Sequence, residues 1–134
     1  MMPPSRSSKP TEPKPSRARQ RAHRGGERAE ALAALYLQLK LYRILARRFK
    51  TPVGEIDLVA QRWGTTVFVE VKARSTPRQE AEALAQVNQA RISRAASYWL
   101  SRNPDKAETP MRFDVIFLAP WHWPRHHKDA FDAS

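Results

Sequence analysis

The chain contains no cysteine, which excludes a disulfide-stapled scaffold and zinc sites with cysteine ligands. The lack of cysteine also suits a reducing compartment, so we expect a cytoplasmic protein. No stretch approaches the roughly 18 consecutive apolar residues of a membrane-spanning helix, and we expect no membrane partner. Acidic residues are scarce, with 13 Asp and Glu against 24 Lys and Arg in 134 residues, giving a net charge of +11. This balance favours anionic partners, nucleic acid first among them.

The first 24 residues lack every large aliphatic and aromatic type except methionine, and they hold five of the eleven prolines and seven Lys or Arg. Such a segment cannot bury enough apolar surface to offset its loss of conformational entropy. We therefore predict a disordered basic tail over residues 1–24 and one domain over residues 25–134. The tail has no apolar region of a secretory signal, and its prolines oppose the helix of a transit peptide. It either contacts phosphates non-specifically or only keeps the chain soluble.

Beyond the tail, the hydrophobic pattern predicts a helix, three strands, a long helix and a further strand. The strands are expected over residues 42–49, 55–62, 66–73 and 111–119, and the helices over residues 27–41 and 79–102. The apolar face of the first helix consists of Leu32, Leu35, Tyr36 and Leu39. A hairpin turn is expected at Trp63-Gly64-Thr65, and the chain from Pro120 onward is expected to be irregular. Interleaved helices and strands indicate an α/β fold with a mixed sheet.

Two neighbouring strands carry charges where a buried strand would have none. Glu70 and Lys72 share one face of their strand, because side chains two residues apart point the same way. A turn near Trp63-Gly64 sets Asp57 of the preceding strand directly opposite Glu70. Like charges in that position are destabilising, so either Lys72 or a divalent cation such as Mg²⁺ must compensate them. The alternative is a partly solvated ion-pair cluster on an exposed sheet face.

Two complete heptapeptides carry a resemblance to a known family. They are Gly54-Glu55-Ile56-Asp57-Leu58-Val59-Ala60 and Phe68-Val69-Glu70-Val71-Lys72-Ala73-Arg74. Together they resemble the signature of the YraN-like family of bacterial endonuclease-like proteins, within the PD-(D/E)xK nuclease superfamily. The resemblance covers most of residues 25–131. It implies a three-layer α/β/α core of restriction-endonuclease type with a central mixed sheet.

The resemblance also implies an activity, which is metal-dependent hydrolysis of phosphodiester bonds in DNA, with branched or otherwise structured DNA as a candidate substrate. In this scheme Asp57 and Glu70 hold Mg²⁺ or Mn²⁺, and the backbone carbonyl of Val71 supplies a further oxygen. Lys72 stabilises charge at the reacting phosphate. Glu27, at the start of the first helix, completes the acidic cluster directly or through a water. Its alternative role is that of a surface glutamate favoured by the helix dipole.

Basic and amide side chains around the acids are the expected phosphate contacts, namely Arg74, Arg78, Gln89 and Arg91. Relatives carry a Lys-Gln pair on the long helix, and Asn88-Gln89 stands there in this chain. Gln89 either contacts phosphate or is a partly buried amide, and the arginines either bind phosphate or only solubilise the protein. No base-reading motif is evident, so substrate choice would rest on DNA shape. Resolvase-like relatives act as dimers, which makes a homodimer a further expectation.

Other candidate ligands are assigned structural roles. Glu55 is expected to pair with a basic side chain, and Asp114 with an arginine. His126 and His127 are adjacent, so along a strand they would face opposite ways, and no third ligand accompanies them. We therefore expect no zinc site. Because a nuclease fold does not guarantee catalysis, the alternative to an enzyme is a non-catalytic basic domain that binds nucleic acid or acts as an adaptor.

Overall fold

The computed structural model describes the backbone of residues 17–131 and the side chains of residues 26–131. Its elements are α1 (Arg17–Leu39), β1 (Arg43–Thr51), β2 (Gly54–Arg62), β3 (Thr65–Ala73), α2 (Pro77–Ala85), α3 (Gln89–Arg102), a 3₁₀ turn η1 (Pro104–Lys106), β4 (Met111–Leu118) and β5 (Arg125–His127). The strands form one sheet in the order β1-β2-β3-β4-β5. The β3–β4 pair is parallel and the other pairs are antiparallel, so the sheet is mixed, as predicted.

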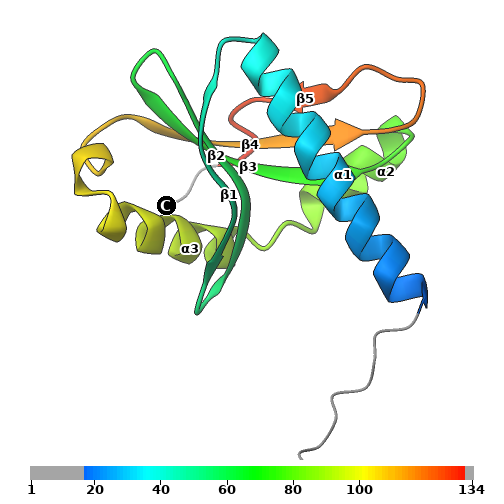
Figure 1. The fold of residues 1–134 in the computed structure, drawn as a ribbon, viewed down its shortest axis with the longest axis horizontal. Helices are drawn as coiled ribbons and strands as arrows, with labels where there is room; N and C mark the ends of the chain where they lie inside the picture. Colours follow the sequence, from blue (N-terminus) through cyan, green and yellow to red (C-terminus); the bar gives the residue numbers. More distant parts are fainter. Residues whose placement is uncertain (1–16, 132–134) are drawn as a thin grey trace, which may run out of the picture.

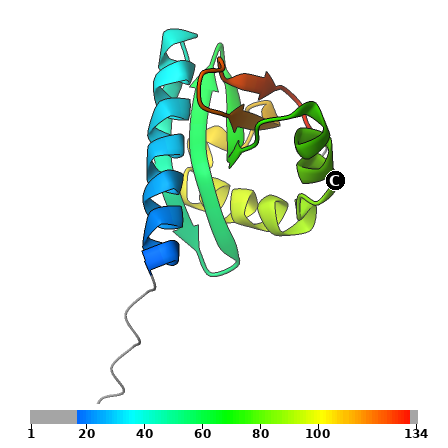
Figure 2. The same cartoon turned by 90° about the vertical axis from the view of Figure 1, so that its right-hand side faces the viewer.

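The sheet lies between helices (Figures 1 and 2): α1 covers one face, and α2 and α3 cover the other. The layer under α2 and α3 is rich in aromatic residues and includes Phe68, Trp99, Phe113 and Phe117. The layer under α1 includes Ala33, Leu37, Leu58, Val69 and Ile116. Alternation along β3 and β4 sends successive residues to opposite layers. The three-layer α/β/α fold expected for a restriction-endonuclease-like core is therefore confirmed.

The first helix differs from its prediction in where it begins. It starts at Arg17, so residues 17–24 are helical and the predicted disordered tail is wrong for that stretch. Two glycines inside a helix cost about 1 kcal/mol each. The Ala, Arg and Gln residues before them are strong helix formers, and α1 runs through Gly25-Gly26. Residues 1–16, which hold the rest of the predicted tail, lie outside the described residues.

The packed face of α1 also differs from its prediction. The residues against the sheet are Glu30, Ala33, Ala34 and Leu37, all buried, whereas Leu32, Leu35 and Leu39 are 56%, 53% and 71% exposed. Three of the four predicted residues are therefore on the outer side of the helix, and only Tyr36 packs against the core under α1. The spacing of large side chains suggested that face, but the sheet is met by a stripe of small residues, which let the helix backbone come close.

The C-terminal end of α1 is a Schellman motif. The N–H of Tyr42 donates to the carbonyl of Leu37 at 2.9 Å, and the N–H of Leu41 donates to Gln38 at 3.0 Å. Leu41 occupies the left-handed position of this motif with φ +71°. Glycine is the usual residue there, because a Cβ is unfavourable at positive φ. Tyr42 and Leu37 are both buried, and their burial fixes the entry into β1.

The single long helix predicted over residues 79–102 is wrong, since the structure divides it into α2 and α3. Gln86 closes α2, and its N–H donates to carbonyls of the last turn. Asn88 then begins a new helix, because its side chain accepts a hydrogen bond from the N–H of Arg91 at 3.1 Å. A side-chain oxygen at this position competes with the helical backbone for the same donors. The break turns the N-terminus of α3 toward the β1–β2 turn.

The predicted irregular segment after Pro120 contains β5, which pairs antiparallel with β4 over three residues. So short a strand has too few residues for alternation to reveal it. No helix among residues 17–131 is long and apolar enough to cross a membrane.

Candidate functional site

The site begins where β2 and β3 stop pairing. The hairpin turns at Trp63 and Gly64, both at positive φ, and the ladder runs from Arg62 opposite Thr65 to Leu58 opposite Val69. The next step of this register sets Asp57 against Glu70, as the sequence predicted. There the carboxylate Oδ2 of Asp57 accepts a hydrogen bond from the N–H of Val71 at 2.8 Å. A side chain has thus replaced the backbone partner, and both acids lie at the point where the strands separate.

The two carboxylates are electrostatically linked. Burial and, after it, the neighbouring charge of Asp57 together raise the pKa of Glu70 to about 8, against the opposing charges of Lys72 and Arg91. Burial also raises the pKa of Asp57, against the hydrogen bond from Val71. Two partly buried acids that resist ionisation together form a site that favours a compensating cation or a shared proton. Such perturbation is typical of functional sites, although structural ion pairs also produce it.

A cavity of about 360 Å³ opens beside the acids, between the β1–β2 turn, β3 and the start of α3. Its polar lining consists of Glu55, Glu70, Lys72, Gln86, Asn88 and Arg91. Lys72 and Glu70 point into the same cavity because they are two residues apart on β3. The cavity therefore presents two acidic and two basic side chains to any group that enters it.

Arg91 joins two of the segments that line this cavity. Its Nε donates to the carbonyl of Val53 at 3.1 Å, which ties α3 to the β1–β2 turn. Gly54 sits under the guanidinium at φ +150°, and a Cβ added there would lie 2.9 Å from the Arg91 Nε. The close approach of Arg91 thus requires glycine at position 54. Arg91, predicted as a phosphate contact, also has a structural role.

Glu30 is the acidic residue of α1 that acts on Asp57 in the structure. It is 5% exposed, and its charge adds to the raised pKa of Asp57. Its carboxylate accepts hydrogen bonds from Arg47 at 2.6 and 3.2 Å. Sequence reasoning missed Glu30 because it selected the wrong face of α1. Its place on the stripe of Ala33, Ala34 and Leu37, three, four and seven residues later, is the signal that identifies it.

Glu27, the predicted third acid, is in an exposed ion pair with Arg48, whose Nη1 lies 2.7 Å from its Oε1. The Nε of Arg48 also lies 3.6 Å from Glu55, so the prediction that Glu55 pairs with a basic side chain is confirmed. Arg48 has φ +50° inside β1, at the position across from Asp57. A strained non-glycine residue therefore lies beside the candidate site.

The donor set fits a hard divalent cation held mainly by oxygen. Asp57 and Glu70 supply carboxylates, and the carbonyl of Val71 faces β2 as its N–H does, since both groups of a strand residue point to one neighbour. Among residues 26–131 no group of three or more His, Asp or Glu side chains gathers closely enough to bind a metal by itself. Mg²⁺ binding through one or two carboxylates, with water and phosphate completing the shell, needs no third side chain.

The remaining predicted contacts lie farther along the chain. Arg74 directly follows β3, and its Nη1 donates to the carbonyl of Ala73 at 2.7 Å. Arg78 is exposed on α2 and forms an ion pair with Glu82 at 3.3 Å. Gln89 is exposed at the first position of α3, so the interpretation of a partly buried amide is wrong. The α2–α3 break places Gln89 directly after the Asn88 that lines the cavity.

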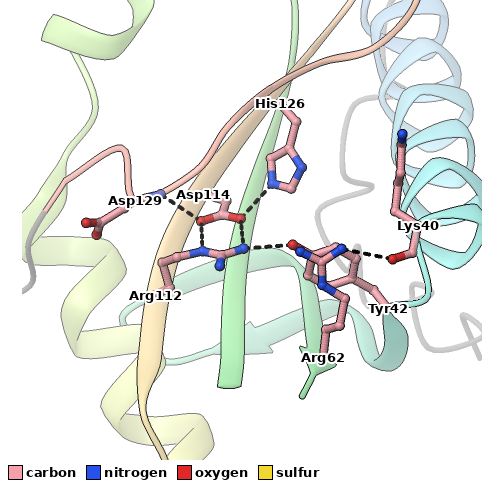
Figure 3. Close-up of polar contacts among 7 residues, drawn as sticks. All are labelled: Lys40, Tyr42, Arg62, Arg112, Asp114, His126 and Asp129. Atoms are coloured by element: carbon pink, nitrogen blue, oxygen red, sulfur yellow. Dashed lines mark hydrogen bonds and ion pairs between the residues drawn. The ribbon is translucent and has the colours of Figure 1, made fainter. Parts of the chain in front are cut away.

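A second polar cluster lies under α1, on the other face of the sheet (Figure 3). Asp114 is fully buried and accepts two hydrogen bonds from Arg112, at 2.7 and 2.8 Å, as the predicted arginine partnership requires. His126 Nε2 lies 2.6 Å from the same carboxylate, and the N–H of Asp129 donates to it at 3.0 Å. Burial alone would raise the pKa of Asp114, but the hydrogen bonds from His126, Arg112 and the backbone outweigh it and lower the pKa. This cluster joins β4 to β5.

The two adjacent histidines face opposite ways, as predicted. His126 reaches Asp114, whereas the His127 ring packs edge-on against Phe117, with centroids 5.2 Å apart, and its Nε2 lies 3.6 Å from Glu80. They are thus engaged separately. Arg112 also donates to the hydroxyl of Tyr42 at 2.8 Å, which extends the Asp114 cluster to the end of α1.

Comparison with known proteins identifies a family. The model of the family described as "Uncharacterised protein family UPF0102" matches residues 29–118. A UPF0102 protein of Mesorhizobium japonicum is 51% identical over 118 residues, covering 88% of this chain and 94% of that protein. A UPF0102 protein of Rhodopseudomonas palustris is 55% identical over 117 residues, covering 87% and 90%. The chain therefore belongs to the UPF0102 family, the YraN-like group that its paired heptapeptides resemble.

Proposed function

We propose that this protein is a metal-dependent endonuclease that hydrolyses phosphodiester bonds in DNA. The observation that carries the proposal is the linked pair Asp57 and Glu70, whose pKa values are raised, beside Lys72 in a cavity. A structural ion-pair cluster would pair each acid with a cation of its own. Here Asp57 and Glu70 both act on Lys72, and their pKa values stay raised although Arg91 also faces Glu70, which suits a divalent ion.

Each group has a role in such a reaction. Asp57 and Glu70 hold Mg²⁺ or Mn²⁺, with the carbonyl of Val71 as a further oxygen. The bound ion would supply charge stabilisation at the phosphoryl oxygens and polarisation of water. Lys72 places a fixed positive charge where negative charge develops, which is the most effective position for it. Glu30 adds negative charge behind Asp57 and keeps Arg47 beside the site.

Basic residues around the cavity support a nucleic-acid substrate. Arg91 lines the cavity with Lys72, and Arg74 and Arg78 follow on the β3–α2 connection and the first turn of α2. With a net charge of +11, phosphate contacts would dominate the affinity and make it depend on salt rather than on base sequence. Because no base-reading motif is evident, substrate choice would rest on DNA shape, such as a branch or a flap.

The alternative is a non-catalytic domain that binds nucleic acid. One observation favours it: within the described part of the chain, no third carboxylate joins Asp57 and Glu70 in a group that would bind metal unaided. In that case the basic surface would bind DNA and the acid pair would be a relic of the fold.

A cleavage assay with matched variants decides between the two. The substrates are a four-way junction, a flap, a single strand and a duplex, each with Mg²⁺ or Mn²⁺. We expect wild type to cut at least one of the first three and Asp57→Asn to lose at least 100-fold of the rate. Asparagine retains an acceptor for the Val71 N–H, so the fold is spared. Asp105→Asn makes the same change at an exposed position and should cut normally. Binding by wild type without cleavage of any substrate would favour the alternative.

A further inference from the structure

The outer side of α1 carries a second apolar stripe. Leu32, Leu35 and Leu39 are each more than half exposed, while the small residues on the opposite side pack on the sheet. A helix that is apolar on both sides is expected to be covered on both sides. The stripe therefore requires an occupant that the described residues do not supply.

The stripe forms one wall of a groove of about 480 Å³. The other wall is the β4–β5 connection, which lies beside α1 (Figure 2), and the ends of β3 and β4 form the floor. Leu32, Leu35, Leu39, Pro120 and Trp123 line it, and Arg28 is its one formally charged residue among those the structure describes. The groove and the candidate site use alternate residues of β3, Ala73 and Lys72, and so lie on opposite faces of the sheet.

Two exposed tryptophans, Trp121 and Trp123, project beside this groove and form what we call the knob, and the groove is the hollow that would receive it. Trp121 is fully exposed at φ +65°, and Trp123 is 85% exposed on the same connection. With the three leucines they present on the order of 700 Å² of apolar surface, taking 150–250 Å² for each aromatic side chain. Typical monomers show a largest patch of about 300–600 Å². A standard protein interface buries about 800 Å² on each partner, so the patch has the size of one interface.

We propose that this groove is the interface of a homodimer, in which the Trp121–Trp123 connection of each copy inserts into the groove of the other. A knob and a hollow on one face are self-complementary, which is what a two-fold interface requires. The nearly uncharged lining lets two copies with a net charge of +11 meet without placing like charges in contact.

The chain's own termini are poor occupants. Residues 3–16 contain no Ala, Val, Ile, Leu, Met, Phe, Trp or Tyr, and the last three residues are Asp132, Ala133 and Ser134. A flat lipid surface would not fill a hollow between a helix and a loop. The proposal does not depend on the endonuclease function, because the groove and the cavity that Glu70 and Lys72 line are separate and lie on opposite faces of the sheet.

Sedimentation equilibrium of the full chain tests the interface, with Trp121→Glu for the knob, Leu35→Glu for the hollow and Trp63→Glu as control. Trp63 is also an exposed tryptophan at positive φ, 82% exposed and outside the groove, so the control matches in charge and backbone. We expect wild type and Trp63→Glu to be dimers at 20 µM. Both groove variants should raise the dimer Kd at least 100-fold while keeping the wild-type circular dichroism spectrum.

Three results would overturn the proposal: a wild-type monomer at 200 µM, a dimer that survives both groove variants, or a dimer lost equally in Trp63→Glu. Flotation of a monomeric wild type with anionic vesicles, abolished by Trp121→Glu, would instead assign the groove to a membrane surface. Mn²⁺ binding measured on the same samples separates the two proposals, since monomeric groove variants should bind the ion as wild type does.

Discussion

The carboxylate of Asp57 accepts a 2.8 Å hydrogen bond from the backbone N–H of Val71 at the point where β2 and β3 separate. This contact orients Asp57 from one strand against the backbone of the next. It brings the carbonyl of Val71 to the same side, so the three candidate oxygen donors come from two adjacent strands. The site is therefore built into the sheet, where geometry is held more firmly than on a loop.

The pH dependence of stability should report Glu70. Its pKa is about 8 in the folded protein against 4.5 ordinarily, so the folded state binds this proton more tightly. Without metal, the contribution of Glu70 to stability is then fully present below pH 4.5 and is lost as pH rises through 8. Glu70→Gln should remove this loss, so that its free energy of unfolding at pH 9 exceeds that of wild type by about 2–4 kcal/mol. Urea unfolding at pH 5, 7 and 9 in chelator measures the difference, and parallel curves for the two proteins would contradict the prediction.

Metal binding should release protons and strengthen with pH. Below pH 8 a cation at Asp57 and Glu70 displaces the proton of Glu70, so affinity for Mn²⁺ should rise by up to about tenfold per pH unit. Calorimetry in two buffers of different ionisation enthalpy counts the protons. The Asp57→Ala, Glu70→Ala double variant should bind no ion. Equal Mn²⁺ affinity in wild type and in this variant would show that the ion does not bind at these acids.

The same calorimetry shows which of the two glutamates of α1 contributes more to Mn²⁺ binding. Glu30 is buried and acts on Asp57, whereas Glu27 is exposed with Arg48. Glu30→Gln should therefore weaken Mn²⁺ binding more than Glu27→Gln. The reverse order would restore Glu27 as the third acid.

Lys72→Ala should abolish cleavage and spare DNA binding. Its ammonium is one of many positive charges for overall affinity, but at the reacting phosphate such a group is typically worth about 3–4 kcal/mol, or 10²–10³ in rate. Single-turnover cleavage and a binding isotherm at one salt concentration separate the two effects. Cleavage at the wild-type rate would reduce Lys72 to a counter-ion of the acid pair.

Asp114→Asn should destabilise the fold by about 3 kcal/mol, because it leaves the partly buried Arg112 without its charge partner. Asp129→Asn is the control, since only the backbone of Asp129 serves the cluster and its side chain is exposed. Thermal unfolding should show a large fall in Tm for the first and little change for the second. Similar Tm values for both would mean that the cluster contributes little.

Leu41→Gly should stabilise the protein by about 1 kcal/mol, which corresponds to a rise of roughly 4 °C or more in Tm for a domain of this size. Leu41 is 74% exposed at φ +71°, so glycine relieves strain and sacrifices little packing. Gln38→Gly, at an exposed and ordinary helical position, should instead cost about 1 kcal/mol. A loss of stability in Leu41→Gly would show that the leucine side chain is needed.

The sequence by itself determined the hairpin and its two acids. The tight turn at Trp63-Gly64 fixes the register of β2 on β3, and this local constraint alone sets Asp57 opposite Glu70. Alternation likewise determined that His126 and His127 face apart. The pairing of Asp114 with an arginine could be predicted for the same reason, because Arg112 and Asp114 share one face of β4.

Only the tertiary structure decided which side of α1 packs, and with it that Glu30 rather than Glu27 acts on Asp57. Large leucines mark one side of that helix and small alanines the other, and both satisfy a helical period. The choice depends on how closely the sheet approaches, which contacts between distant segments set. The break at Gln86–Asn88, the short β5 and the raised pKa of Glu70 have the same origin. Each follows from burial and cross-chain contact, and these quantities exist only once the chain has folded.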